Sequence, residues 1–229
     1  MIFGAILAGG IGERIGLEDP KQFYRINNKP LLIYSIESFL KVDDFDLIFV
    51  SSPKDYIDKT KEVIDEFILE GKEKLKVISG GKTRNDTILN SIAASGKTDD
   101  SIMVTHDAAR IFVTPEQIQM SIDYCKEYTA SSPVIPSVDV VFESKQKGEL
   151  TSIPPRKNLV RAQTPQAFKI NKFIEIYEDL DESEIKLLDE AMALFYLRNE
   201  SIYLFEGDTS NFKVTVPLDI DIAKTILEK

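Results

Sequence analysis

Residues 1–23, MIFGAILAGGIGERIGLEDPKQF, begin with an apolar run that breaks into a glycine-rich loop and then presents two cations, Arg14 and Lys21. Such a loop after a strand exposes backbone N–H groups at a helix N-terminus, where anions bind. Arg offers phosphate a planar fork and Lys offers it a point charge. The stretch therefore predicts an α/β fold with a phosphate site, and a triphosphate would use both cations.

The loop differs from two familiar phosphate-binding motifs. Gly10 and Gly12 open a G-x-G-x-x-G fingerprint, but Ile15 stands where the third glycine belongs. A P-loop is also excluded, because Lys21 follows Pro20 and no Ser or Thr comes after it. A plain tight turn with two solvated cations remains the alternative at this point.

Short apolar runs alternate with amphipathic stretches along the rest of the chain. Strands that are apolar on both faces and alternate with helices indicate a parallel sheet covered on both sides. We therefore expect a single Rossmann-like α/β domain over residues 1–229, with a mostly parallel, twisted sheet. The expected strands are 3–8, 45–52, 75–81, 101–107 and 202–207, and the expected helices are 31–40, 57–68, 87–95, 115–125, 171–180, 182–197 and one from about Pro217.

Residues 138–158 break this pattern. They alternate like a β-hairpin, with a turn at 147–149 and with Pro154 and Pro155 closing the second limb. A hairpin of this size has too little core of its own, so we expect an arm that projects from the domain and packs on a second copy of the chain.

The composition excludes several classes of partner. With 229 residues and a formal net charge of -10, the chain lacks the clustered cations that nucleic acids and anionic lipids select. No run approaches the ~18 apolar residues of a membrane span, so we expect a cytoplasmic protein with neither signal peptide nor anchor. The single cysteine, Cys125, lies at helical spacing and is expected to pack in the core.

Three strand ends carry unusual chemistry: residues 8–16 (AGGIGERIG), 79–86 (SGGKTRND) and 105–110 (THDAAR). The carboxyl ends of parallel strands share one edge of a sheet, so these segments should meet at one crevice. Asp107 at such an end suits Mg²⁺, which takes one or two carboxylates together with phosphate and water oxygens. The alternative is an Asp that caps a helix beside a packed His106. A hydrolytic triad is excluded, because no G-x-S-x-G elbow is present.

Two further segments suit a nucleotide. Gly81 lets the backbone approach a flat ligand, and Thr87 could offer its hydroxyl to a base edge, although the same string could simply cap a helix with Asn85 or Asp86. Lys213 lies in the otherwise apolar stretch 210–217, SNFKVTVP, where an unpaired ammonium is costly. It therefore predicts an anionic partner, unless Lys213 is on a solvated edge strand.

These motifs together resemble a known family. LAGGIGERIG followed by PKQF resembles the signature of sugar-nucleotide and polyol-phosphate nucleotidyltransferases, and PKQ is similar to the cytidylyltransferases acting on 2-C-methyl-D-erythritol 4-phosphate and on ribitol 5-phosphate. GGKTRNDTI, VTHDAAR, QTPQAF and FKVT agree in order and approximate position, so the resemblance spans essentially the whole chain. It implies CTP as the nucleotide donor and Mg²⁺ as the metal.

The resemblance also assigns roles to residues. It implies that Arg14, Lys21 and Lys213 are catalytic, and that Asp107, which would also hold the metal, binds the acceptor with Arg110, Arg156 and Thr164. It further implies a homodimer in which the arm, with Arg156, reaches the neighbouring subunit. The CTP pocket would consist of Leu7, Ala8, Gly9, Gly10, Gly12, Gly81, Lys82, Arg84, Thr87 and Ala108, with Lys82 standing where the family often has an acidic residue.

The acceptor is less well specified. Residues 1–16, 51–64 and 83–88 resemble the ribitol 5-phosphate enzymes more closely, so CDP-ribitol is the expected product and 2-C-methyl-D-erythritol 4-phosphate is the second candidate acceptor. The family's arm carries an Asp-Thr pair, whereas this chain has Asp139 followed by Val140. Two other classes stay open: a dinucleotide-binding oxidoreductase, although residues 49–54 offer no carboxylate for a ribose, and a nucleotide-binding subunit without activity.

Overall fold

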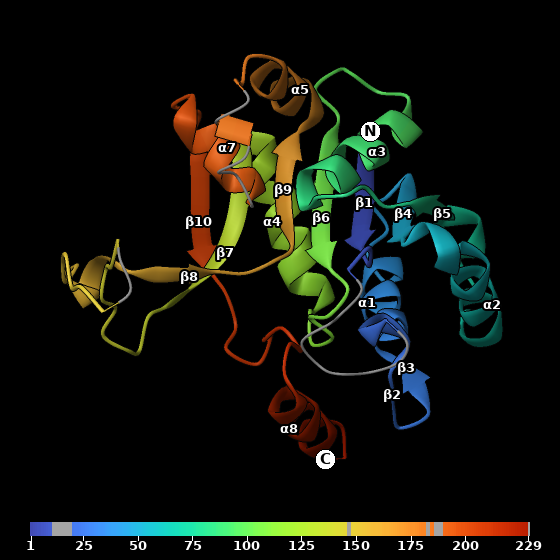
Figure 1. The fold of residues 1–229 in the computed structure, drawn as a ribbon. Helices are drawn as coiled ribbons and strands as arrows, with labels where there is room; N and C mark the ends of the chain where they lie inside the picture. The colour runs from blue at the N-terminus through green and yellow to red at the C-terminus, as the bar shows by residue number, and fades with distance from the viewer. Residues whose placement is uncertain (11–19, 146–147, 182–183, 186–189, 229) are drawn as a thin grey trace.

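The computed structural model describes residues 1–10, 20–145, 148–181, 184–185 and 190–228. Within them, an eight-stranded sheet has the order β10-β7-β9-β6-β1-β4-β5, with β8 paired to β7 (Figure 1). The pairs β1–β4, β1–β6, β4–β5 and β7–β10 are parallel, whereas β9 is antiparallel to β6 and β7, and β8 is antiparallel to β7. The prediction of a mostly parallel sheet is confirmed. The strands are β1 (Ile2–Leu7), β4 (Leu47–Ser52), β5 (Leu75–Ser79), β6 (Ile102–Asp107), β7 (Ala130–Pro136), β8 (Val160–Ala162), β9 (Gln166–Lys169) and β10 (Ile202–Glu206).

The central strands are apolar throughout because both faces of the sheet are covered. Along β1, Ile6 packs into a first buried cluster and Phe3 into a second, on the opposite face of the sheet. The first cluster includes side chains of α1 (Leu31–Leu40), α2 (Ile57–Phe67) and α4 (Pro115–Glu127), and the second includes side chains of α3 (Arg84–Ser95), α5 (Ile170–Glu178) and α7 (Ala191–Leu197). Helices on both faces were expected and are confirmed.

A third, smaller cluster lies at the end of the domain. It joins α8 (Pro217–Leu227) to β2 (Arg25–Ile26), which forms a small antiparallel pair with β3 (Lys29–Pro30). Figure 1 shows α8 beyond the carboxyl ends of β1 and β6, where the loop after β10 leads. No helix in the described part of the chain has both the length and the apolar composition that a bilayer span needs.

Several strands were not predicted: β7, β8 and β9 of the main sheet and the small pair β2 and β3. The four residues of β9, for example, are too few to establish a period of two. The helix expected over 182–197 is described as α7 from Ala191 onward, and residues 182–183 and 186–189 lie outside the described part.

Cys125 is buried in the first cluster, as expected, and burial raises the pKa of its thiol to about 12.

The arm at residues 138–158 projects beside β8, but it is not the regular hairpin that its alternation predicted (Figure 1). Its described limbs meet at one isolated bridge, between Glu143 and Ser152. Pro154 and Pro155 have no N–H to donate, and residues 156–158 form a short 3-10 helix, so the pairing does not extend toward the base. The arm exposes several apolar side chains along its length, including Val138, Val140, Phe142, Leu150 and Ile153.

Candidate active site

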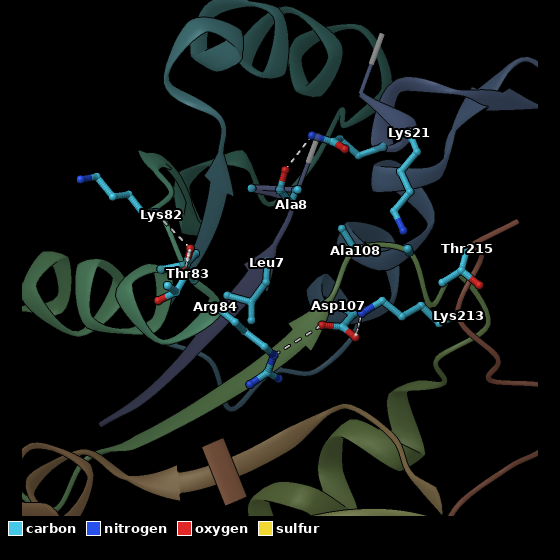
Figure 2. A pocket seen from close by; sticks show the side chains of 16 residues that line it. Leu7, Ala8, Lys21, Lys82, Thr83, Arg84, Asp107, Ala108, Lys213 and Thr215 are labelled. Carbon is cyan, nitrogen blue, oxygen red and sulfur yellow. Dashed lines mark hydrogen bonds and ion pairs between the residues drawn. The ribbon is translucent and has the colours of Figure 1, made fainter. Parts of the chain in front are cut away.

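A cavity of about 560 Å³ lies beyond the carboxyl ends of β1, β5 and β6, and the three unusual strand ends meet there. Figure 2 shows its side chains converging from the two sides of this crevice, with Lys21 and Lys213 near Asp107 and Ala108. The residues that line it are Leu7, Ala8, Gly9, Gly10, Lys21, Gln22, Gly81, Lys82, Thr83, Arg84, Thr87, Asp107, Ala108, Ala109, Lys213 and Thr215.

One wall of the cavity is the loop that leads into α3. Thr83 caps this helix: its hydroxyl accepts from the Asp86 N–H at 3.0 Å, and the Asp86 carboxylate accepts from the Thr83 N–H at 3.0 Å. Gly81 must be glycine because a Cβ there would lie 2.2 Å from the Asp86 Cβ. The Thr87 hydroxyl donates to the Thr83 carbonyl at 2.9 Å and accepts from the Gly81 N–H at 3.0 Å. Its proton is therefore committed to the loop, contrary to the expectation that it would be offered to a base edge.

Lys21 reaches the cavity from a short 3-10 helix, Lys21–Phe23. Its ammonium donates to the Val214 carbonyl at 3.0 Å, beside Lys213. The next residue anchors this segment, because the buried Gln22 amide donates to the Ala8 carbonyl at 2.6 Å. Lys21 is thus held between the glycine loop of β1 and the segment that carries Lys213.

Asp107, at the end of β6, is the centre of a charge cluster. Its carboxylate lies 2.8 Å from the Lys213 ammonium, 3.7 Å from Arg110 Nε and 3.8 Å from Arg84 Nε. Burial alone would raise the pKa of the Asp107 carboxyl, but Arg84, Lys213 and Arg110 together lower it well below its ordinary value. Asp107 is therefore ionised at neutral pH, and the surrounding guanidinium and ammonium groups leave the cluster with an excess of positive charge.

The anionic partner predicted for Lys213 is the Asp107 carboxylate of the same chain, 2.8 Å from the ammonium. The same segment is fixed by Asp219 at the start of α8, whose carboxylate accepts from the Thr215 N–H at 2.6 Å, the Thr215 hydroxyl at 2.8 Å and the Val216 N–H at 2.9 Å. Because Asp107 holds the Lys213 ammonium and Asp219 fixes the following residues, Lys213 is preorganised to stabilise charge that develops on a bound phosphate.

A family model extends over nearly the whole chain. The IspD model, 2-C-methyl-D-erythritol 4-phosphate cytidylyltransferase, matches residues 2–229. The chain belongs to this family. It is a CTP-dependent cytidylyltransferase of the IspD type, which makes it a nucleotidyltransferase and removes the oxidoreductase and the inactive subunit from consideration.

Solved structures share the fold of this IspD-family chain. The 4-diphosphocytidyl-2C-methyl-D-erythritol synthase of Anaerococcus prevotii is 22% identical over 100% of this chain and 96% of its own, with a TM-score of 0.82. The 2-C-methyl-D-erythritol 4-phosphate cytidylyltransferases of Francisella tularensis and Thermus thermophilus are also 22% identical. The first covers 98% of both chains with a TM-score of 0.81. The second covers 99% of this chain and 98% of its own with a TM-score of 0.73.

The comparisons correct the ranking of acceptors. The sequence motifs placed the ribitol 5-phosphate branch first, whereas neither the family model nor these solved structures support that branch. The likeness to the ribitol enzymes covers three short stretches, whereas the family model matches residues 2–229.

Most residues that sequence assigned to CTP line the cavity, but two have unexpected directions. Lys82 is exposed and its side chain extends away from the labelled cations (Figure 2). Arg84 lines the cavity but points to Asp107, on the side of the acceptor residues, and donates to Gln166 Oε1 at 3.3 Å. Gly12 and Arg14 lie outside the described residues.

The residues assigned to the acceptor are divided between three places. Asp107 lines the cavity and Arg110 lies against it, whereas Thr164 is buried beneath and its Oγ1 accepts from the Asp107 N–H at 3.1 Å. Arg156 is in the arm and lines a separate groove at the arm's base. A single copy of the chain therefore does not bring Arg156 to the cavity.

Sequence reasoning missed several residues of the site. Gln22 was part of the quoted PKQ motif, but only the fold shows its amide holding the Ala8 carbonyl. Glu190 gave no signal within a helix-like stretch, yet its Oε1 lies 3.6 Å from Arg84 NH1. Both of these atoms are buried without a hydrogen-bond partner, so the pair is an ionic contact without a directed hydrogen bond.

Proposed function

We propose that this chain transfers CMP from CTP to 2-C-methyl-D-erythritol 4-phosphate and releases pyrophosphate. The family model, which covers residues 2–229, supports this acceptor. The observation that carries the chemistry is the cavity in which Lys21, Lys213 and Asp107 meet beside the glycine loop of β1.

The nucleotide half of the cavity is formed by the ends of β1 and β5. Leu7, Ala8, Gly9 and Gly10 present backbone to the phosphates, and Gly81 gives the base an approach to the α3 loop. Thr87 serves this half through the loop that it holds, because its proton is already donated to Thr83. Ala108 also lines the cavity and completes the nucleotide pocket. Gly12 belongs to this pocket by the resemblance.

The reaction needs no general base from the protein. An oxygen of the acceptor phosphate, anionic near neutral pH, attacks the α-phosphorus of CTP in line; the new P–O bond forms as the bond to pyrophosphate breaks. Negative charge spreads over the α-phosphate and the leaving group, and fixed cations stabilise it. Two contacts support this role for Lys21 and Lys213: the Lys21 ammonium donates to the Val214 carbonyl, and the Lys213 ammonium lies 2.8 Å from Asp107. The resemblance adds Arg14 as a third cation.

The resemblance makes Asp107 the one protein ligand of a magnesium ion, which would have to replace the Lys213 ammonium that lies 2.8 Å from the same carboxylate. No group of three or more His, Cys, Asp or Glu side chains is placed to hold a metal among the residues that the structure describes. Mg²⁺ accepts such a site, because it takes most of its ligands from phosphates and water. We propose that Asp107 holds it there, where it would neutralise charge on the triphosphate.

A homodimer would bring Arg156 to the acceptor. Arg156 lies in the arm, away from the cavity of its own chain, and the arm exposes Val140 and Phe142 at 60% and 63%. Apolar side chains exposed in a row on a projecting segment are typical of an interface. We propose that the arm of one copy packs on the other and supplies Arg156 to the acceptor bound beside Asp107 and Arg110.

Ribitol 5-phosphate is the second candidate acceptor. It is favoured by the likeness of residues 1–16, 51–64 and 83–88 to the ribitol enzymes. Val140 stands where the family's arm offers a hydroxyl to the acceptor phosphate, and this difference does not discriminate between the two acceptors, because both carry a phosphate.

The test is pyrophosphate release with CTP and Mg²⁺, comparing 2-C-methyl-D-erythritol 4-phosphate, ribitol 5-phosphate and glycerol 3-phosphate. We expect kcat/KM for the methylerythritol phosphate to exceed the other two by at least about tenfold, a difference of about 1.4 kcal/mol in transition-state binding. Preference for ribitol 5-phosphate would keep the chemistry and overturn the acceptor. Release with none of the three would overturn the proposal.

A further inference from the structure

The chain's only histidine lies directly beneath the charge cluster. His106 is fully buried in β6, next to Asp107, and its two ring nitrogens face different partners. Nε2 lies 3.1 Å from the Arg110 carbonyl oxygen, and Nδ1 lies 3.0 Å from Thr164 Oγ1. Both polar atoms of this buried ring are therefore hydrogen-bonded, as burial requires, and the identity of the two partners decides what the ring does.

The partners determine which nitrogen carries the proton. A backbone carbonyl only accepts, so Nε2 is protonated and donates to Arg110. The neutral ring then presents a bare Nδ1, to which the Thr164 hydroxyl donates its proton. The same Thr164 oxygen accepts from the Asp107 N–H at 3.1 Å. The hydrogen bonds therefore run in one direction, from Asp107 through Thr164 and His106 to Arg110.

This chain of bonds begins and ends on one turn of backbone. The Arg110 N–H donates to the Asp107 carbonyl at 2.9 Å, so residues 107–110 form a closed turn that His106 and Thr164 brace from below. The turn carries the Asp107 carboxylate and the Arg110 guanidinium, which itself donates to the Asn211 carbonyl at 2.9 Å. A displacement of the turn would move both groups relative to Lys213.

We propose that His106 is a positioning residue: through Thr164 and the Arg110 carbonyl it fixes the turn that carries the acceptor-side charges of the active site. Thr164 then acts on the acceptor through its hold on the Asp107 backbone, and its hydroxyl has no proton left to donate to an acceptor phosphate. The effect on the acceptor rests on the proposed function, whereas the bonding of the ring does not.

The ring can be tested without any activity measurement. In protein labelled with ¹⁵N-histidine, a long-range ¹H–¹⁵N spectrum contains signals from one imidazole only, because the chain has one histidine. We expect the Nε2–H tautomer at neutral pH, and we expect Thr164→Val to shift the Nδ1 signal while Thr164→Ser does not. The Nδ1–H tautomer, a charged ring, or an Nδ1 signal that ignores Thr164→Val would overturn the proposal.

The effect on the acceptor is tested by separate KM values. A displacement of the order of 1 Å can cost up to about a hundredfold in rate. We expect Thr164→Val and His106→Asn each to lower kcat/KM for the acceptor by roughly ten- to a hundredfold, with a clearly smaller rise in KM for CTP. The rise is smaller because only Asp107 and Ala108 of this turn are proposed to reach the nucleotide. Their combination should cost little more than either alone, because both cut the same connection.

A control variant separates positioning from general packing. The buried Ser121 hydroxyl is 3.0 Å from the Pro165 carbonyl, one residue after Thr164, but does not touch the turn. Ser121→Ala should therefore leave the acceptor's kcat/KM within about twofold. A folded Thr164→Val variant with wild-type acceptor kinetics, or KM values for CTP and acceptor that rise together, would overturn the proposal. A wild-type protein that is inactive on every acceptor would overturn the proposed function instead. The ¹H–¹⁵N spectrum would still test the tautomer and the hydrogen bonds of His106.

Discussion

At the scale of single residues, Lys21 offers the most direct test of the charge argument. Its ammonium is fixed at 3.0 Å from the Val214 carbonyl, where it can stabilise charge on the leaving pyrophosphate. We expect Lys21→Ala to lower kcat by about 10²- to 10³-fold with a much smaller change in KM for CTP, as measured by steady-state pyrophosphate release. Lys61→Ala, which removes an exposed lysine paired with Asp58, is the control for loss of one positive charge. A Lys21→Ala enzyme with near-normal kcat would remove Lys21 from the mechanism.

His106 makes stability depend on pH. Burial is the largest cause that lowers its pKa from 6.5 to about 4, so the unfolded chain binds a proton that the folded chain refuses. The free energy of unfolding should therefore be highest above pH 6.5 and fall by roughly 3 kcal/mol as the pH drops to about 4. Urea titrations at pH 7, 5.5 and 4.5 measure this slope, and the same series on His106→Asn should give a shallower slope, because only carboxylates with lowered pKa values, such as Asp107, then contribute. An equal slope in both proteins would assign the effect to other groups.

At the scale of elements, two helices carry the same N-terminal cap in different surroundings. Thr83 caps α3 at the wall of the cavity, and Thr114 caps α4, which covers the sheet; each is paired with the side chain three residues on. Thr83→Ala and Thr114→Ala should each cost about 1 kcal/mol of unfolding free energy. Only Thr83→Ala should raise KM for CTP, because α3 positions the Gly81 loop. If both variants bind CTP like wild type, the α3 cap has no part in the nucleotide site.

The elements also show what a single sequence specifies. Long strands such as β1 and β6 begin as apolar runs because they are buried on both faces, so their existence and type follow from pattern alone. The four residues of β9 are too few for a pattern, and the arm alternates like a hairpin although its prolines leave one bridge between the described limbs. Alternation of apolar and polar residues indicates which side chains share a face of an extended segment. It does not indicate whether the backbone is hydrogen-bonded to a neighbouring strand.

Some residues of the cavity could be predicted because they belong to a recognisable sequence motif. Others could not, because only the fold brings them together. Gly81, Asp107 and Lys213 could be named from their segments, since strand ends and a lysine among apolar residues carry a chemical signal. The direction of Arg84 toward Asp107, and the contact with Glu190, depend on α3 and α7 lying on the same face of the sheet. Such contacts between distant segments have no signature in one sequence.

At the scale of the whole molecule, the arm predicts self-association. Val140 and Phe142 are exposed on a segment with little core of its own, and an interface would bury them. We expect a dimer in sedimentation velocity, and we expect Val140→Ser combined with Phe142→Ser to shift it toward the monomer and to lower acceptor turnover through loss of Arg156. Leu69→Ser is the control, because Leu69 is 87% exposed elsewhere on the surface. A wild-type protein that sediments as a monomer at assay concentration, yet is fully active, would contradict the shared site.

The arm leaves and re-enters the domain through two neighbouring strands, since Pro136 at the end of β7 is opposite Val160 at the start of β8. A segment attached in this way is an insertion whose length and sequence can be exchanged by recombination without altering the order of the sheet. The glycine loop, Gly81 and Lys21 belong to other elements and stay in place during such an exchange. Within one lineage of enzymes, the choice of acceptor can therefore diverge while the choice of nucleotide is inherited unchanged.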